Sequence, residues 1–338
     1  MDKNVFKNGV NLPTEQVGWG IIGVGDVCEV KSAPAMNLIS GSKLVAVMRR
    51  NAEKAADFAK RHNVPKWYDD ADALINDPEV NAVYIATPPD THAFYALKVA
   101  AAGKPIYVEK PMARTHQECL NMVEACKKAQ VPLYVAYYRR ELEIYKTVKR
   151  LITEGVIGDV RLVDIKLFKH TQINNDENWR LNPEIAGGGL FYDLASHQLD
   201  IMDYLFGEIK SAQGFGTNQA GKYPAEDIVM GNFCFENGIM GQGTWCFNAA
   251  PNSEVELTTI YGSKGQLSFT FFSNFHIELK INGQRKKILK FDMPKHIQQP
   301  LIQTIVDDLQ GKGTCISTGV SGARTNWVME QMCQRITI

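Results

Sequence analysis

The stretch Lys104-Pro105-Ile106-Tyr107-Val108-Glu109-Lys110-Pro111 gives the clearest indication of the fold. Its apolar centre, Ile106–Val108, follows a Gly-Lys-Pro turn and is typical of a buried parallel strand. A Glu, a Lys and a Pro come next, at the carboxyl end of that strand, which in open α/β sheets is the edge where ligands bind. Pro111 disfavours helical backbone at Lys110, so we expect this lysine on an extended elbow.

An amine at this position has a chemical use. Lysine shifts its pKa readily when it is desolvated or placed near positive charge, so Lys110 beside a cofactor would suit a proton donor or acceptor. Taken alone, Glu-Lys-Pro fits an ordinary solvated loop between a strand and a helix equally well. The remaining sequence has to distinguish these two interpretations.

Length and composition indicate a soluble globular protein of two domains. The chain has 338 residues, too many for one ordinary core. Hydrophobic residues make up 45% and charged residues 22%, as is usual for globular proteins. Because 37 Lys and Arg balance 37 Asp and Glu, the net charge points neither to nucleic acid nor to a membrane surface as a partner.

Cysteine usage and hydropathy favour a cytoplasmic location. The seven cysteines include no CxxC pair, which fits reduced thiols better than disulfides or zinc, and no metal site is predicted. No apolar run approaches the ~18 residues that span a bilayer. Residues 1–14 are polar and lack the apolar region of a secretory signal.

A glycine-rich turn near residue 23 resembles a dinucleotide fingerprint. The expected strand 17–22 runs into Gly23-Val24-Gly25-Asp26-Val27-Cys28 and then a helical segment. Gly23 would permit the tight turn, and Gly25 would let the backbone approach a pyrophosphate. The third position of the fingerprint is Cys28 where glycine is usual. A lone GxG is a weak signal, but the strand before it and the helix after it strengthen the prediction.

The choice of cofactor depends on the end of the second strand, 43–48. An NAD site would place an acidic residue there, about 20 positions beyond the glycine turn. The chain has Arg49-Arg50 instead, and two guanidinium groups can bind a 2′-phosphate bidentately. The alternative is that the pair simply opens a solvated helix. The missing acid favours NADP(H), with NAD(H) as the second possibility.

Strands and helices alternate through the first half, which predicts βαβ units and a doubly wound parallel sheet. The glycine turn, Arg49, Thr87-Pro88 and Lys110 all fall just past strand ends and would line one edge. His92 opens a helix, where capping or packing is the more common role. Further expected elements are helices 51–62, 70–75, 93–102 and 115–130 and strands 64–68, 82–86 and 133–137.

The pattern changes after residue 137, so we expect domains at 1–137 and 138–338. The second half predicts several antiparallel strands with turn signals between them, followed by two closing helices. Its expected helices are 142–153, 190–205, 298–309 and 321–333, and its expected strands are 160–168, 227–235, 240–247, 254–261, 266–272 and 276–282.

Asp193 and His197 form the second chemical motif. At positions i and i+4 of one helix they would share a face, and a carboxylate can orient an imidazole and raise its basicity. This arrangement suits a general base, although a core histidine satisfied by a neighbouring Asp is the more common origin of such a pair. The glycines 187–189 just before it would let the helix approach a ligand or another surface.

The order of these motifs resembles the glucose-fructose oxidoreductase/inositol dehydrogenase/MocA family of nicotinamide-dependent sugar oxidoreductases. The resemblance covers nearly the whole chain and is most specific at 101–111 and 187–197. It implies a Rossmann domain followed by an α/β domain with a large, open, mostly antiparallel sheet. In the family this sheet is often used for oligomerisation, so a homodimer or homotetramer is expected. The family tolerates the departure at Cys28.

The resemblance also implies roles for individual residues. Lys110, His197 and Asp193 would be catalytic, with Glu109 orienting Lys110 or the nicotinamide side of the pocket. Trp179-Arg180 is similar to a pair that contacts cofactor or substrate in NADP-using members, and Tyr137 and Arg139 to the segment that closes over the cofactor. The implied cofactor-binding set is Gly23, Val24, Gly25, Asp26, Val27, Arg49, Arg50, Thr87, Pro88, His92, Glu109, Lys110, Arg139, Trp179 and Arg180.

The expected activity is hydride transfer between NAD(P) and a secondary alcohol or ketone of a sugar, cyclitol or related polyol. Related possibilities are a 1,5-anhydro-ketose or dicarbonyl-sugar reductase, a trans-dihydrodiol dehydrogenase, and an enzyme that cleaves glycosides with tightly bound NAD. A non-catalytic NADPH sensor is the alternative of another class. Substrate choice in this family depends on the loop 170–184 and on the sheet face.

Overall fold

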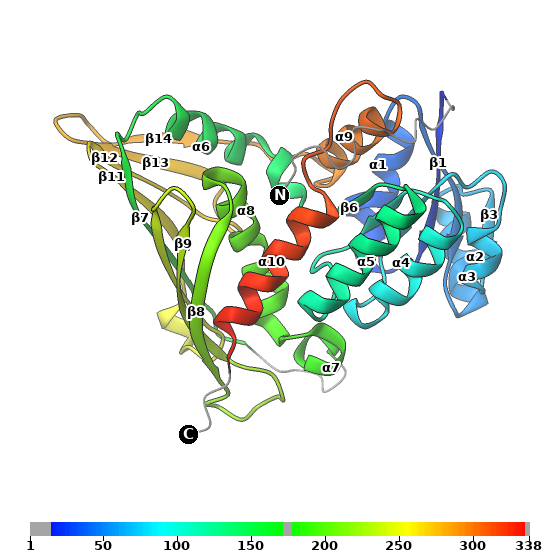
Figure 1. Ribbon diagram of the computed structural model, residues 1–338, viewed down its shortest axis with the longest axis horizontal. Helices are drawn as coiled ribbons and strands as arrows, with labels where there is room; N and C mark the ends of the chain where they lie inside the picture. The colour runs from blue at the N-terminus through cyan, green and yellow to red at the C-terminus, as the bar shows by residue number, and fades with distance from the viewer. Residues whose placement is uncertain (1–14, 172–177, 335–338) are drawn as a thin grey trace. The chain divides into compact units, whose positions relative to one another are not determined.

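A computed structural model describes residues 15–171 and 178–334, which form two compact units (Figure 1). The first unit contains the described residues up to Ala113, together with Gln117–Tyr138 and Pro294–Ala323. The second contains Arg114–His116, the described residues between Arg139 and Met293, and those from Arg324 onward. Residues 1–14, expected to lack a secretory signal, and 172–177, within the expected specificity loop, lie outside the described residues.

The first unit contains the predicted parallel sheet, with the strand order β3-β2-β1-β4-β5-β6. Every residue of β1 is buried, as expected for a central strand that helices cover on both faces. Because the order reverses between β1 and β4, the carboxyl ends of these strands form a topological switch point. The strands are β1 (Val17–Ile22), β2 (Ser42–Met48), β3 (Lys66–Tyr68), β4 (Ala82–Ile85), β5 (Ile106–Val108) and β6 (Leu133–Val135).

Short polar side chains begin two of the helices in this unit. The Asn51 side chain accepts a hydrogen bond from the main-chain N–H of Lys54, and the Asp70 side chain accepts one from Ala73, both at 2.9 Å. The helical elements are a π-helical turn Cys28–Ser32, α1 (Ala33–Leu38), α2 (Ala52–Arg61), α3 (Ala71–Ile75), a 3-10 turn Pro89–Thr91, α4 (His92–Ala101), α5 (His116–Ala129) and α9 (Gln299–Leu309).

Residues 294–323, which the sequence pattern placed in the second domain, pack in the first unit instead. The reason lies in β6, whose edge needs hydrogen-bond partners. Ser317 supplies them: its carbonyl accepts from the Val135 N–H at 3.0 Å, and its hydroxyl donates to the Val135 carbonyl at 2.7 Å. The Tyr134 hydroxyl also donates to Asp308 Oδ2 at 3.0 Å. Helix α10 (Gly319–Met332) then carries the chain from the first unit into the second.

The second unit contains an eight-stranded sheet with the order β14-β13-β12-β11-β7-β10-β9-β8. All neighbours are antiparallel except β7 and β10, so the predicted mostly antiparallel sheet is confirmed. The strands are β7 (Val160–Phe168), β8 (Ile209–Thr217), β9 (Ile228–Phe235), β10 (Met240–Cys246), β11 (Val255–Gly262), β12 (Gly265–Phe269), β13 (His276–Ile281) and β14 (Lys287–Lys290).

Two of these strands, β8 and β14, were not predicted. Strand β8 contains glycines, which are depleted in strands. At Gly214 the glycine is needed for packing, because a Cβ there would lie 2.5 Å from the Met230 carbonyl oxygen and 2.7 Å from that of Met332. Strand β14 is only four residues long and has a lysine at each end, so its sequence carries little strand signal.

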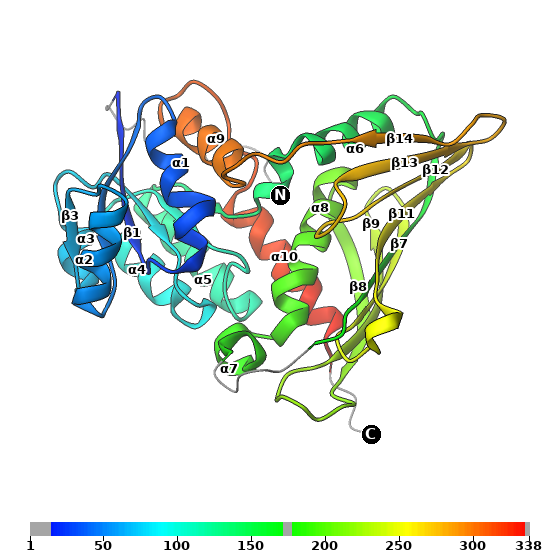
Figure 2. The same cartoon turned by 180° about the vertical axis from the view of Figure 1, so that it is seen from behind.

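Helices α6 (Glu143–Thr153) and α8 (Ser196–Phe206) cover one face of this sheet (Figure 2). From β10, the indole N–H of Trp245 donates to Gln198 Oε1 of α8 at 2.7 Å. Tyr145 of α6 packs edge-on against Phe269 of β12, with ring centroids 5.9 Å apart. The smaller helical elements are the 3-10 turns Tyr138–Glu141, Trp179–Leu181 and Pro251–Ser253, α7 (Pro183–Ala186) and a π-helical turn Phe191–Ala195.

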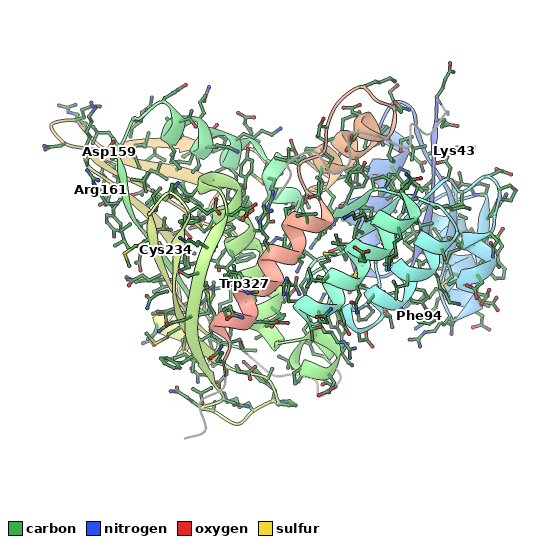
Figure 3. The ribbon with its side chains drawn as sticks, in the orientation of Figure 1. Lys43, Phe94, Asp159, Arg161, Cys234 and Trp327 are labelled. Atoms are coloured by element: carbon green, nitrogen blue, oxygen red, sulfur yellow. The ribbon has the colours of Figure 1, made fainter. Side chains whose placement is uncertain are left out.

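The opposite face of the sheet, which we call the outer face, carries exposed apolar side chains. Strand pairing aligns them in rows, with Phe215 beside Met230 on β8 and β9. Met230, Met240 and Phe215 are each more than half exposed. Cys234, labelled in Figure 3, pairs with Met240 and belongs to the same face. Further exposed members are Val255, Leu257 and Tyr261 of β11.

Candidate functional site

The glycine turn after β1 has the geometry that a pyrophosphate requires. Gly23 has a φ of +91°, and a Cβ there would lie 2.5 Å from Thr87 Cγ2 and 2.9 Å from the Thr87 nitrogen. A Cβ on Gly25 would meet nothing within 4 Å, so its missing side chain leaves open space over the backbone. A switch-point turn with an uncovered backbone fits a dinucleotide phosphate.

Cys28, the departure from the fingerprint, is accommodated because its side chain points into the core. It is fully buried at the start of the π-helical turn, with its Sγ 4.0 Å from the Gly23 carbonyl oxygen. Burial raises the pKa of the Cys28 thiol to about 12, so it remains neutral. Asp26 is exposed, Val24 is buried and Val27 is half-buried.

The structure separates the two arginines that follow β2. Arg49 is half-buried, and its Nη1 donates to the carbonyl oxygen of Val24, in the glycine turn, at 3.1 Å. Arg50 is exposed. Arg49 is therefore the member of the pair that is brought to the turn, where a guanidinium can contact a phosphate at the same time.

His92 links two of the loops that were predicted to line the edge of the sheet. It is fully buried, with its Nε2 2.7 Å from the Thr87 carbonyl oxygen and its Nδ1 3.2 Å from the carbonyl oxygens of Pro111 and Met112. Burial lowers the pKa of His92. Both ring nitrogens contact main chain, so His92 links the end of β4 to the Lys110 elbow and fits the packing role that the sequence left open.

Glu109 accepts hydrogen bonds in a buried network that sequence reasoning missed. The Tyr84 hydroxyl donates to Glu109 Oε1 at 2.5 Å, and the Gln298 side-chain amide donates to the same oxygen at 2.6 Å. The Lys110 main-chain N–H donates to Oε2 at 3.1 Å. The Tyr107 hydroxyl donates to Gln298 Oε1 at 2.9 Å. Burial raises the pKa of both tyrosines well above its usual value, so both remain hydrogen-bond donors.

Part of this network had a weak sequence signal. Tyr84 and Tyr107 interrupt two apolar strands at positions that pair in the sheet, and their rings stack with centroids 4.5 Å apart. Buried tyrosine hydroxyls usually need a partner. Gln298 precedes α9, 189 positions after Glu109, and no spacing rule joins residues so far apart.

In the second unit, Asp193 and His197 belong to two consecutive helical elements and not to one regular helix. Asp193 lies in the π-helical turn, whereas His197 is in the first turn of α8. Arg180 Nε lies 3.6 Å from Asp193 Oδ2, and the Arg180 guanidinium also stacks on Trp179, 4.3 Å from the ring centroid. The structure thus brings the predicted residues Trp179, Arg180 and Asp193 together. Such π-helical turns are frequent at functional sites.

The glycines 187–189 serve close packing of the chain itself. At Gly187, where φ is +88°, a Cβ would lie 2.7 Å from the Arg114 carbonyl oxygen. At Gly188 a Cβ would overlap the ring of Tyr192. The glycines therefore let the segment before Asp193 approach its own neighbours, which is a packing role.

Phe272 is a second feature that the sequence did not reveal. The Arg139 guanidinium lies 4.9 Å from its ring centroid, and the Lys169 ammonium lies 5.9 Å from it. The His197 ring meets Phe272 edge-on, with centroids 6.2 Å apart. Glu256 holds this turn by accepting a hydrogen bond from the Phe272 N–H at 2.8 Å. Arg139 and His197, predicted separately, therefore contact one aromatic ring.

A buried ion network anchors α8 one turn beyond His197. Arg140 binds Asp200 through two nitrogens, with Nη2 2.7 Å from Oδ1 and Nε 2.9 Å from Oδ2. Arg324 of α10 binds Asp203 in the same way, at 2.6 and 3.1 Å. Burial raises the pKa of Asp200 to about 6, although Arg140 opposes that shift.

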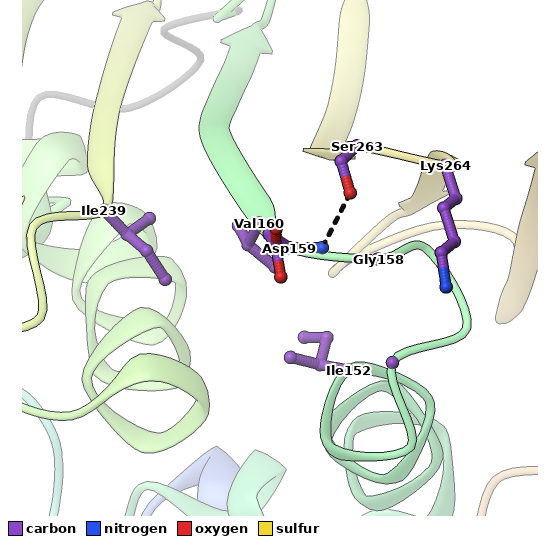
Figure 4. A pocket seen from close by; sticks show the side chains of 8 residues that line it. Ile152, Gly158, Asp159, Val160, Ile239, Ser263 and Lys264 are labelled. Atoms are coloured by element: carbon purple, nitrogen blue, oxygen red, sulfur yellow. Dashed lines mark hydrogen bonds between the residues drawn. The ribbon is translucent and has the colours of Figure 1, made fainter.

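A separate hollow of about 430 Å³ lies at the amino-terminal end of β7 (Figure 4). The Asp159 main-chain N–H donates to Ser263 Oγ across its wall at 3.0 Å. Its lining contains none of the predicted site residues and consists of Ile152, Gly155, Gly158, Asp159, Val160, Ile239, Ser263 and Lys264.

Two general features of the described residues bear on function. Among residues 15–171 and 178–334, no helix is both long enough and apolar enough to span a bilayer. In that same part of the chain, His, Cys, Asp and Glu side chains do not gather in groups of three or more that would hold a metal ion.

Comparison with known families matches both units to one family. Residues 17–137 match a model described as an oxidoreductase family with an NAD-binding Rossmann fold, labelled GFO/IDH/MocA. Residues 145–268 match the GFO/IDH/MocA C-terminal domain.

Individual relatives agree with these matches. The chain is 40% identical over 323 residues to Oxidoreductase P35 of Formosa agariphila, covering 94% of this chain and 98% of that protein. It is 28% identical over 254 residues to 1,5-anhydro-D-fructose reductase of Ensifer adhaerens, covering 74% of each. Its fold is similar to that of a levoglucosan dehydrogenase in complex with NADH and levoglucosan, with a TM-score of 0.84, 23% identity and coverage of 94% and 96% of the two chains.

Proposed function

Because the chain belongs to the GFO/IDH/MocA oxidoreductase family, we propose that it transfers a hydride between NADP(H) and a secondary alcohol or ketone of a sugar, cyclitol or related polyol. The observation that carries this proposal is the arrangement of residues at the carboxyl edge of the first sheet. There the glycine turn has open space over Gly25, and Lys110 follows a buried carboxylate after β5. The substrate class is supported by relatives named for levoglucosan and 1,5-anhydro-D-fructose.

In the proposed mechanism, the substrate hydroxyl is held by Lys110 Nζ and a ring nitrogen of His197. His197 takes the hydroxyl proton during oxidation and returns it to the developing alkoxide during reduction. Lys110, as a cation, stabilises the alkoxide charge and shares the proton transfer. Asp193 orients His197. A bound nicotinamide would supply the hydride-transfer chemistry at this site.

The residues that would hold the pyrophosphate and the 2′-phosphate are in the first unit. The backbone from Gly23 to Val27 would contact the pyrophosphate, and Arg49 would bind a 2′-phosphate while it remains hydrogen-bonded to Val24. Arg50, which is exposed, would add a second contact to the 2′-phosphate from the solvent side. Thr87 lies directly against Gly23 and would border the same turn.

Titration with NADPH and NADH tests this arrangement. We expect tighter binding of NADPH by the wild type, and a loss of about 10–100-fold in NADPH affinity in Arg49→Ala, as for removal of a charge-assisted phosphate contact. Binding of NADH, which lacks the 2′-phosphate, should change less than threefold and is the internal control. Quenching of protein fluorescence gives both dissociation constants.

Other results of this titration point elsewhere. Equal affinity of the wild type for both cofactors would make NAD(H) the cofactor and reduce Arg49 to a structural contact of the glycine turn. A larger effect of Arg50→Ala than of Arg49→Ala would contradict the separate roles given to the two arginines. A wild type that binds neither cofactor would remove the basis for hydride transfer.

We also propose that a second copy of the chain covers the outer face of the eight-stranded sheet. That face exposes Phe215, Met230 and Met240, each more than half accessible, and it continues across β11. Contiguous apolar surface of this kind usually marks an interface between proteins.

The double variant Met230→Glu/Met240→Glu tests this interface. We expect it to shift the mass measured by light scattering from an oligomer to the 37.8 kDa monomer, because each protomer would bury two charges. Phe94→Glu is the matched control, since Phe94 is equally exposed but lies on α4 of the first unit (Figure 3). A monomeric wild type, or equal effects of the two changes, would contradict the proposal.

A further inference from the structure

The carboxylate of Glu109 is held by a set of hydrogen-bond donors. All three groups that contact its carboxylate are donors: the Tyr84 hydroxyl, the Gln298 amide and the Lys110 main-chain N–H. At the other end of the same amide, the Gln298 oxygen accepts from the Tyr107 hydroxyl at 2.9 Å. The nitrogen of Gln298 faces Glu109. An ionised carboxylate accepts hydrogen bonds and donates none, so this set of donors fits an anion at Glu109.

This anion is close to the glycine turn. The Glu109 main-chain N–H donates to the Ile85 carbonyl at 2.9 Å, and the next residue, Ala86, donates to the carbonyl of Ile22, directly before the glycine turn, at 2.8 Å. Burial lowers the pKa of His92, which bridges the Thr87 and Pro111 loops, and the Glu109 charge opposes that shift. Glu109 therefore projects its charge into the same sheet edge at which the dinucleotide is proposed to bind. Its contacting groups are neutral, so they orient the charge without cancelling it.

We infer that Tyr84 and Gln298 are positioning residues that hold Glu109 as a fixed negative charge beside the cofactor site. The oxidised dinucleotide has a cationic nicotinamide ring, whereas the ring of the reduced form is neutral. The negative charge therefore raises the affinity of the site for the oxidised form relative to the reduced form. The inference rests on the proposed function, because it requires a nicotinamide cofactor at this edge. It gives Gln298, which lies far along the chain from Glu109, a role in setting the relative affinities for the oxidised and reduced cofactor.

The ratio of the two dissociation constants, Kd of oxidised over Kd of reduced cofactor, measures this effect. Glu109→Gln removes the charge and keeps the size of the side chain. Even for unit charges about 12 Å apart at an effective dielectric constant near 20, Coulomb's law gives about a tenfold effect, so we expect this ratio to rise at least tenfold. Tyr84→Phe and Gln298→Met each remove one donor and leave the charge in place but less well held, so each should raise the ratio about two- to fivefold. Calorimetry for the oxidised form and fluorescence for the reduced form provide the constants without turnover.

Gln303→Met is the matched control. Gln303 lies on α9, the helix that begins directly after Gln298, and its amide donates to Asp307 Oδ1 at 2.9 Å. We expect no change in the ratio. A merely structural role for Tyr84 or Gln298 would weaken both cofactor forms by one common factor and leave the ratio constant. Tyr84→Phe is the milder of the two variants and keeps the test available where Gln298→Met does not fold.

Each result has a distinct meaning. A ratio within twofold of the wild type in Glu109→Gln, with both forms still bound, would overturn the role of the charge. A shift in Glu109→Gln without one in Tyr84→Phe and Gln298→Met would overturn the positioning role. Absence of cofactor binding by the wild type would instead contradict the proposed function itself.

Discussion

Replacing Lys110 with Ala is expected to lower kcat by about 10²–10⁴-fold, the usual loss when a positioned acid or base is removed. His197→Ala should fall in the same range, because the two side chains are proposed to share one substrate hydroxyl. Cofactor affinity should fall far less than kcat, since the glycine turn and Arg49 are unchanged. Steady-state kinetics with a panel of sugars and polyols, together with thermal unfolding of each variant, measure both effects.

Lys104→Ala is the control for this experiment. Lys104 flanks the other end of the same strand, β5, and its Nζ donates to the Asp77 carbonyl oxygen at 2.9 Å. It is remote from the carboxyl edge, so kcat should stay within about twofold, as for a residue outside the acid–base set. Losses below tenfold in both Lys110→Ala and His197→Ala, in folded protein, would show that the acid–base assignment is wrong.

Asp200→Ala is expected to lower the free energy of unfolding by ~3–5 kcal/mol, because it leaves a buried guanidinium without its bidentate partner. The Arg140 side chain is only 5% exposed and that of Asp200 1%, so water cannot replace the lost contact. Arg140 keeps Asp203 at 3.5 Å, which offsets only part of the loss. Urea denaturation of wild type and variant gives the difference directly.

Asp72→Ala provides the comparison. Asp72 pairs with Lys98 at 2.7 Å, as closely as Asp200 pairs with Arg140, but the two side chains are 55% and 38% exposed. Its removal should change the free energy of unfolding by less than ~1 kcal/mol. Similar losses in the two variants would mean that burial of the Arg140 network does not control its contribution.

Much of the fold could be predicted because its strands carry strong local signals. The alternation of apolar strands such as β1 and β5 with helices indicated a doubly wound sheet, and the structure confirms it. Alternation after residue 160 indicated the second sheet, apart from the glycine-containing β8 and the short β14. What local patterns could not show is which unit a late helix joins, and α9 joins the first.

The predicted site residues differ in what the sequence could say of them. Gly23 and Arg49 follow from rules about turns and phosphates, and in the structure the Arg49 side chain reaches the turn that contains Gly23. The roles of Lys110 and His197 stay predictions. Gln298 and Phe272 were missed because their importance arises from contacts across the fold, to Glu109 and to Arg139, which spacing along the chain does not encode.

During translation, the first unit cannot complete its core until residue 323 has left the ribosome. A nascent chain that has reached residue 137 has its six parallel strands, but Val135 on the edge strand β6 still lacks Ser317, and Glu109 lacks Gln298. At 5–20 residues per second, the remaining synthesis takes on the order of 10–40 s. Throughout that interval an unpaired strand edge is open to wrong partners, so this half of the protein is expected to depend on chaperones although its strands are made first.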